Sequence, residues 1–134
     1  GADQDTPHLA HILNFIRNRW TIDPTRILLT GMSDGGTFTY TSGLERASPF
    51  THLAPVAAAF HPMLVQMASE ARLNALPIHI IHGARDWMFP IDMARDANQH
   101  FTRAAASVTY RELDDLSHSY GADLSSMIMD WLLA

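Results

Sequence analysis

Apolar residues recur along this chain at two spacings, one typical of helices and the other of buried strands. Near the N-terminus they return every three or four residues, which predicts a helix with one apolar face. The members of this stripe are Leu9, Ile12, Leu13, Ile16 and Trp20. Thr6 followed by Pro7 predicts the start of the helix, because a capping side chain precedes a residue that has no N–H to satisfy. Asp23-Pro24 predicts a turn after it.

Further along, short apolar runs alternate with longer segments. Continuous apolar runs are typical of parallel strands that are covered on both faces. Such runs occur at residues 27–29, 55–60 and 77–81. Residues 108–113 instead alternate apolar and polar side chains, which predicts an edge strand with one face in solvent.

The segments between these strands predict helices. Residues 91–106 and 122–133 have helical patterns, and residues 63–75 predict a helix or a helix with a loop. Residues 37–42 have low helix propensity, and we expect a helix there only because the motif described below requires one. Strands that alternate with helices indicate βαβ units. The predicted fold class is therefore α/β, with about four parallel strands flanked by helices.

Composition narrows the function classes. The 134 residues predict a single domain, residues 1–134. A net charge of -5 without any Lys/Arg run argues against a nucleic-acid partner. The chain has no cysteine, and His8 and His11 have no third ligand nearby, so we expect neither a metal nor a cofactor. No apolar stretch approaches the roughly 20 residues that span a bilayer, and residues 1–5 lack signal-peptide features. We therefore expect no membrane association and leave the compartment open.

The most informative motif follows the first predicted strand. Residues 31–35 read Gly-Met-Ser-Asp-Gly, the G-x-S-x-G form of a nucleophile elbow, in which a strand turns sharply into a helix and exposes a serine hydroxyl. Glycine suits this turn because the serine backbone is strained, and we expect side chains at Gly31 or Gly35 to collide across it. Ser33 is therefore the candidate nucleophile.

Two later residues could activate this serine. His118 would accept the Ser33 proton and return it to the leaving alcohol. Asp86 would hold the imidazole in the required tautomer, and it lies a few residues beyond a predicted strand, where the carboxyl ends of parallel strands meet. The order Ser…Asp…His is that of α/β-hydrolase triads. The rival carboxylates are Asp92, Asp114 and Asp115.

Several other residues have two interpretations. The backbone N–H of Asp34 follows the nucleophile and is the predicted oxyanion donor, while its side chain could instead cap the helix. Trp87 could line an acyl pocket or pack under its loop, and His61 could line the mouth of the site or be a hydrogen-bonded loop residue. His79 and His82 flank a predicted strand, so we expect buried imidazoles with satisfied hydrogen bonds.

Three segments together resemble the α/β-hydrolase esterases of the phospholipase/carboxylesterase and polyhydroxyalkanoate-depolymerase-like groups. Residues 22–36 (IDPTRILLTGMSDGG) resemble the nucleophile region of these enzymes. Residues 81–86 (IHGARD), with Phe89-Pro90, resemble their acid loop after the seventh strand, and residues 116–120 (LSHSY) resemble their histidine loop after the eighth. The resemblance implies a truncated α/β-hydrolase with Ser33, Asp86 and His118 as its triad.

The resemblance covers only the carboxyl-terminal half of that fold, in which about four strands precede the helix that opens this chain. It implies that the loop supplying a second oxyanion donor has no counterpart here. It also implies that the strand near Ile27–Thr30 is an exposed apolar edge, and such edges pair readily with other chains. We therefore expect a homodimer joined near that strand.

The predicted function is that of a serine carboxylesterase, which hydrolyses small-molecule esters with short acyl groups through an acyl-enzyme intermediate. Two alternatives stay open. One is a non-catalytic or fragmentary hydrolase half that acts as a binding or oligomerising module. The other is a serine peptidase of the same superfamily, because amide and ester cleavage share the triad.

Overall fold

Helices and strands alternate along the computed structural model, which describes residues 5–19 and 22–134. Trp20, the last member of the predicted apolar stripe, lies outside these residues. The elements in chain order are α1 (Asp5–Arg17), β1 (Leu28–Met32), α2 (Asp34–Gly43), β2 (His52–Val56), α3 (Met63–Met67), α4 (Glu70–Ala75), β3 (Pro77–Gly83), α5 (Ile91–Arg103), β4 (Ser107–Leu113) and α6 (Leu124–Leu133).

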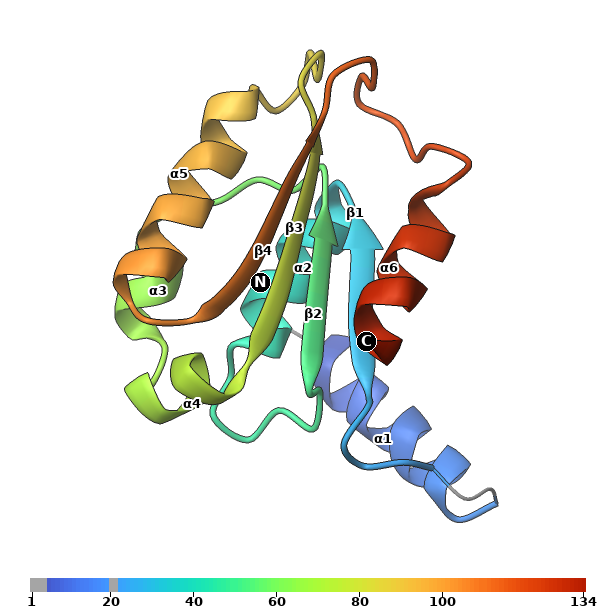
Figure 1. Ribbon diagram of the computed structural model, residues 1–134. Coiled ribbons are helices and arrows are strands. Elements are labelled where there is room, and N and C mark those ends of the chain that lie inside the picture. The colour runs from blue at the N-terminus through green and yellow to red at the C-terminus, as the bar shows by residue number, and fades with distance from the viewer. Residues whose placement is uncertain (1–4, 20–21) are drawn as a thin grey trace.

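The strands form one parallel sheet in the order β1-β2-β3-β4 (Figure 1). The predicted α/β class, with parallel strands flanked by helices, is confirmed. The alternating segment at residues 108–113 lies in β4, an edge strand whose exposure alternates as predicted. Because all strands run the same way, their carboxyl ends meet at one edge of the sheet, at the top of Figure 1.

Two separate apolar clusters hold the layers together. On one face of the sheet, the fully buried Phe101 of α5 stacks on Tyr40 of α2, with ring centroids 5.6 Å apart. Leu9 and Leu13 of α1 pack against this cluster at its margin. On the other face, helix α6 buries Leu124 and Ile128, among others, against the sheet. The carboxyl-end loops therefore stand on a framework that is packed from both sides.

The strand predicted at residues 55–60 was placed too late, because β2 spans His52–Val56. The apolar pattern missed the start of this strand because the start is polar. Thr51, just before β2, accepts a hydrogen bond through Oγ1 from the N–H of Ile27, just before β1, at 2.8 Å, which holds the two strands together. Beyond Val56, the residues are apolar because the loop is buried, not because it is extended. Ala57 has a φ of 48°, which ends the strand.

Helices also end where local geometry demands it. The segment predicted at residues 63–75 divides into α3 and α4, and Ser69 caps α4 by accepting a hydrogen bond from the Arg72 N–H. The Arg72 guanidinium then donates to two carbonyls, those of Gly43 and Phe50, which anchors α4 to the end of α2. Helix α5 stops at Arg103, three residues before its predicted end, and Ala105 adopts a φ of 61°.

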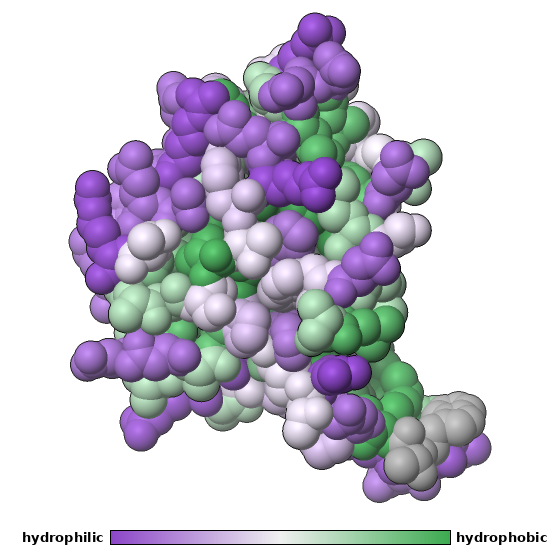
Figure 2. Space-filling view, viewed as in Figure 1, coloured by the Kyte–Doolittle hydropathy of each residue, from purple (hydrophilic) through white to green (hydrophobic). Residues whose placement is uncertain are grey.

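Figure 2 shows a largely polar surface over α5 and the loops at the carboxyl ends, with apolar atoms gathered towards α6 and the β1 side. Leu133 of α6 is 57% exposed and Phe15 of α1 is 53% exposed. Among the described residues, no helix combines the length and apolar character needed to cross a bilayer.

Candidate active site

Ser33 lies at the sharp turn between β1 and α2. Its φ of 58° and ψ of -119° are rare for a residue with a side chain, and its N–H donates to the Val56 carbonyl at 2.9 Å. The bond to β2 holds the strained turn in place. The local sequence therefore folds as the elbow motif predicts, and the helix at residues 37–42 follows within α2.

The glycines around Ser33 are not equally constrained. A Cβ at Gly31 would lie 2.5 Å from the Gly35 carbonyl oxygen, so the prediction for Gly31 is confirmed. The prediction for Gly35 is wrong, because a Cβ there would meet nothing within 4 Å. The second crowded position is Gly36, where a Cβ would lie 2.8 Å from the Val56 carbonyl oxygen because α2 passes close to β2.

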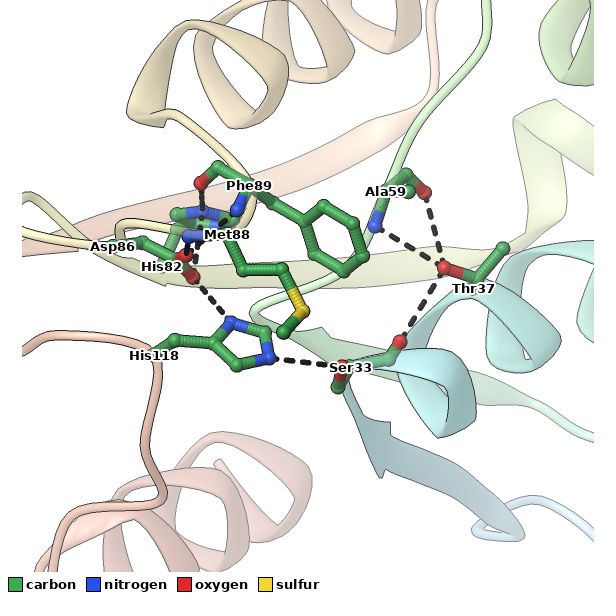
Figure 3. Close-up of polar contacts among 8 residues, drawn as sticks. All are labelled: Ser33, Thr37, Ala59, His82, Asp86, Met88, Phe89 and His118. Carbon is green, nitrogen blue, oxygen red and sulfur yellow. Dashed lines mark hydrogen bonds and ion pairs between the residues drawn. The ribbon is translucent and has the colours of Figure 1, made fainter.

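Three loops bring Ser33, His118 and Asp86 into one hydrogen-bonded row (Figure 3). Ser33 follows β1, Asp86 follows β3 and His118 follows β4. The His118 Nε2 atom lies 2.9 Å from Ser33 Oγ, and the His118 Nδ1 atom lies 2.8 Å from Asp86 Oδ2. Residues that are 85 and 32 positions apart in sequence thus meet at the carboxyl edge of the sheet.

Asp86 is a well-partnered carboxylate with no exposed side-chain surface. Its Oδ1 accepts hydrogen bonds from the backbone N–H groups of Met88 and Phe89, at 2.9 and 2.7 Å, while its Oδ2 accepts from His118. Burial alone would raise the pKa of Asp86, but these hydrogen bonds outweigh it and hold the pKa below its ordinary value. Asp86 is therefore ionised at neutral pH.

The ionised state of Asp86 decides the proton positions on His118. A carboxylate only accepts hydrogen bonds, so Nδ1 of His118 carries the hydrogen. In the neutral imidazole Nε2 then has a free lone pair, directed at Ser33 Oγ. This arrangement allows His118 to take a proton from the serine hydroxyl, which is general-base chemistry.

The rival carboxylates lie elsewhere. Asp92 is 3.6 Å from the Arg95 guanidinium, and Asp115 is 3.6 Å from the Arg85 guanidinium. Both side chains are largely exposed, and Asp114 is exposed as well. The carboxylate that meets His118 is thus the first-ranked one, Asp86.

Asp34 is the first residue of α2, so no carbonyl within the helix is available to its N–H. This N–H lies beside the Ser33 hydroxyl in the chain, at the positive end of the helix dipole. The position suits a donor to an oxyanion on a carbonyl attacked by Ser33.

The two predicted substrate-binding residues have different surroundings. Trp87 is 73% exposed, and its ring lies edge-on to the His118 ring with centroids 6.0 Å apart. The Phe89 ring also lies edge-on to His118, with centroids 5.4 Å apart. His61 lines an open, largely apolar pocket of about 490 Å³ between α2 and α3, and its Nδ1 accepts from the Met63 N–H. Trp87 therefore contacts the site directly, whereas the residues that line the His61 pocket do not include the three residues of the row.

Two further residues support the site, and no sequence motif assigned either of them a role in it. Thr37, one turn along α2, accepts a hydrogen bond from the Ala59 N–H at 3.1 Å and lies 3.3 Å from the Ser33 carbonyl oxygen (Figure 3). His82 lies within β3, 1% exposed, with Nε2 2.7 Å from the Phe89 carbonyl oxygen. Neither role has a sequence signal, because both depend on how the loops fold over the ends of the strands.

The expectation for the two β3 histidines is confirmed for His82 and wrong for His79. His79 is 3% exposed, yet neither ring nitrogen has a hydrogen-bond partner among the described residues. It packs on Trp131 of α6, with ring centroids 5.1 Å apart. Within the part of the chain that the structure describes, no group of three or more His, Asp or Glu side chains is placed to hold a metal ion.

A parallel sheet with this elbow and this row of residues defines the α/β-hydrolase fold. The sequence matches the phospholipase/carboxylesterase family over residues 5–132, and the chain belongs to that family. No curated protein matches it in sequence.

Solved structures of similar fold include SOBER1 from Arabidopsis thaliana, with a TM-score of 0.78 and 19% identity over 96% of this chain. A thermostable esterase has a TM-score of 0.79 and 20% identity over 98% of this chain, and a truncated carbohydrate esterase from gut microbiota has a TM-score of 0.82 and 13% identity over 97%. The chain spans 61% of SOBER1, 36% of the thermostable esterase and 66% of the carbohydrate esterase. At these identities the similarity establishes the fold.

Proposed function

We propose that this chain is a serine carboxylesterase that hydrolyses small esters with short acyl groups through an acyl-enzyme intermediate. The observation that supports this most is the row of hydrogen bonds from Ser33 Oγ to His118 Nε2 and from His118 Nδ1 to Asp86 Oδ2, at 2.9 and 2.8 Å. Membership of the phospholipase/carboxylesterase family supports the same reaction class.

In the first half of the reaction, Ser33 Oγ forms a bond to the ester carbonyl carbon while His118 Nε2 takes the serine proton. The carbonyl electron pair moves onto oxygen, and the Asp34 N–H donates a hydrogen bond to this oxyanion. Asp86 stabilises the imidazolium without taking the proton. When the carbonyl re-forms, the bond to the alcohol oxygen breaks, and His118 gives its proton to the departing alcohol.

In the second half, water repeats the attack. His118 removes a proton from the water as its oxygen bonds to the acyl carbon, and the bond to Ser33 Oγ breaks with return of the proton to Ser33. The products are one alcohol and one carboxylic acid. The reaction needs no oxidant or further reactant beyond water.

Two features favour small substrates. Trp87, whose ring lies edge-on to His118, is 73% exposed, so this wall of the site is in contact with solvent. The apolar pocket of about 490 Å³ is lined by residues of α2 and α3 and of the loops that flank these helices, and not by Ser33. A long acyl chain therefore gains little apolar burial beside the nucleophile.

A series of p-nitrophenyl esters from acetate to palmitate tests this proposal, with Ser33→Ala as the matched control. We expect kcat/KM to fall with acyl length, an initial burst of nitrophenol that scales with enzyme, and loss of both in the control. A rate that rises towards palmitate would contradict the short-acyl preference. Cleavage of aminoacyl anilides with faster kcat/KM than esters would favour a peptidase instead.

We also propose a homodimer through β1. Among the described residues β1 pairs with β2 alone, so its other edge offers backbone donors and acceptors. Exposed apolar side chains on α6, such as Leu133, add burial on the same side of the sheet (Figures 1 and 2). Two β1 edges related by a two-fold axis would satisfy each other. Sedimentation velocity should give a dimer at micromolar concentration; a stable monomer would contradict it.

A further inference from the structure

We propose that His82 is a positioning residue of the active site, holding the acid loop so that Asp86 and Phe89 meet His118 in the required geometry. The effect of His82 on kcat rests on the proposed function. Its effect on the geometry of the loop does not. His82 lies in β3, and its side chain is 1% exposed. No part of the hydrolysis steps above uses it.

The contacts of His82 settle its tautomer. Its Nε2 lies 2.7 Å from the Phe89 carbonyl oxygen and 3.3 Å from Asp86 Oδ2 (Figure 3). Both of these oxygens only accept hydrogen bonds when Asp86 is ionised, so Nε2 carries the hydrogen. One buried N–H therefore faces two oxygens of the same short loop.

Two hydrogen bonds hold the loop at Phe89, one through its N–H and one through its carbonyl. The Phe89 N–H donates to Asp86 Oδ1 at 2.7 Å, and the Phe89 carbonyl accepts from His82. The Phe89 ring, fixed by these two bonds, lies edge-on to the His118 ring with an interplanar angle of 87°. Without His82, the Phe89 carbonyl would lose its buried donor, and the loop would lose its tie to the rigid strand.

His82 also shares Asp86 Oδ2 with His118. His118 Nδ1 is at 2.8 Å and His82 Nε2 at 3.3 Å from this oxygen, so the carboxylate lies between two imidazoles. The hydrogen bond of the His82 N–H goes to the Phe89 carbonyl, and the nearby N–H dipole adds an electrostatic attraction that favours this orientation of the carboxylate. A carboxylate that is held in this way presents one oxygen to His118 throughout the reaction.

The test compares substitutions of His82 that place a side-chain hydrogen-bond donor at different distances from the strand, or remove it. His82→Gln keeps an amide donor near the original Nε2 position, whereas His82→Leu removes the donor and His82→Asn places it too close to the strand. His79→Leu is the matched control, because it removes another buried histidine of β3 that has no described hydrogen-bond partner. For each variant we would count labelled serines with a fluorophosphonate and measure kcat per labelled site and KM.

We expect kcat per labelled site to fall about 10- to 100-fold in His82→Leu and His82→Asn, with KM within about threefold. His82→Gln should recover most of the loss, and His79→Leu should stay near the parent. If His82→Leu does not fold, the pair of Asn and Gln variants carries the same comparison. Equal kcat per labelled site in Asn, Gln and parent proteins would overturn the inference.

A second readout does not depend on turnover. The Nδ1–H of His118, hydrogen-bonded to Asp86, should give a low-field proton NMR signal that broadens in His82→Asn and persists in His82→Gln, because a loosened carboxylate lets this proton exchange faster with water. An inert parent whose signal still depends on His82 would contradict the proposed function and support the positioning role. A signal unchanged in all variants would overturn that role, whatever the activity.

Discussion

His82 and His79 lie three residues apart on the same strand, both almost fully buried, yet their surroundings are opposite. His82 lies near the carboxyl end of β3, where its Nε2 contacts the Phe89 carbonyl and Asp86. His79 lies in the first half of the strand, packed on Trp131, and both of its ring nitrogens lack partners among the described residues. Burial alone therefore says nothing about what a histidine contributes.

The difference follows from position along the strand. Loops with free N–H and C=O groups meet at the carboxyl end of a parallel sheet, so a polar side chain there finds partners. In the middle of a strand the backbone N–H and C=O groups bond to neighbouring strands. Only side chains remain as hydrogen-bond partners for a buried imidazole there. The hydrogen-bonded row of Ser33, His118 and Asp86 accordingly lies at the carboxyl end of the sheet.

The largest effect should come from that row. In Asp86→Asn the residue between His82 and His118 loses its charge, and an amide can no longer fix the His118 tautomer. We expect kcat to fall about 10⁴-fold with little change in KM. Steady-state kinetics on p-nitrophenyl acetate measure this. Asp114→Asn and Asp115→Asn are the controls, and an equal loss in either would remove Asp86 from its proposed role.

Arg72 is a charged residue outside the candidate site whose side chain, like that of His82, has hydrogen-bond partners. Its guanidinium makes bonds of 2.6 to 3.1 Å to the carbonyls of Gly43 and Phe50. Arg72→Met keeps the apolar stem and leaves these carbonyls without their donor, so we expect a loss of about 2–3 kcal/mol in the free energy of unfolding. Urea denaturation measures it, with Arg46→Met on the exposed surface as control. Equal midpoints for the two variants would show that the anchor is dispensable.

His79 should behave in the opposite way, because its removal costs no hydrogen bond to any described residue. Burial, with the nearby charge of Arg111, lowers the pKa of His79 below its ordinary value of 6.5. Below that pH the unfolded chain binds more protons than the folded one, so the free energy of unfolding falls as the pH falls, by at most about 1.4 kcal/mol per pH unit for this one group.

His79→Leu should therefore be at least as stable as the parent at pH 7 and gain a further advantage towards pH 5.5. Urea denaturation at both pH values measures this, with His8→Leu on the exposed face of α1 as control. Some slope should remain, because burial also lowers the pKa of His52. A parent and a His79→Leu variant with parallel pH profiles would refute the unpartnered state of His79.

The smallest effect should belong to a partnered pair in solvent. Hydrogen bonds from Arg95 and Tyr110 lower the pKa of Glu112 to about 2. The stability this gives is present above pH 4.5, the ordinary pKa, and is lost as the pH falls towards 2. The Arg95 side chain is 51% exposed, so solvent screens the pair, and a double-mutant cycle of Arg95→Gln with Glu112→Gln should give a coupling at pH 7 that is well below the loss in Arg72→Met. A coupling as large as that loss would contradict the expected order.

The fold could be predicted from sequence wherever burial and extension coincide. The apolar run at residues 77–81 and the alternating run at residues 108–113 both lie in strands. The run at residues 55–60 misled because Ala57 to Phe60 are mostly buried in a loop that leaves the strand by way of a left-handed residue. An apolar run in the sequence indicates that a segment is buried. Whether the buried segment is a strand or a loop depends on its hydrogen bonds.

The candidate site was predictable as far as motifs encode it. The elbow form, and the order of Ser33, Asp86 and His118, indicated three residues that the fold brings together. The contribution of His82 was not predictable, because the bond from its Nε2 to the Phe89 carbonyl depends on how the loop folds back over β3. The crowding at Gly36 instead of Gly35 depends in the same way on how closely α2 approaches β2.

In the proposed mechanism, His118 and Asp86 activate Ser33. The most direct measurement is the intact mass of the folded protein after incubation with a fluorophosphonate, alongside Ser33→Ala. We expect one adduct on the parent and none on the variant, because only an activated serine hydroxyl displaces fluoride from phosphorus. A folded parent that forms no adduct would contradict this mechanism and would favour a binding or oligomerising module that keeps the residues of the row without their reactivity.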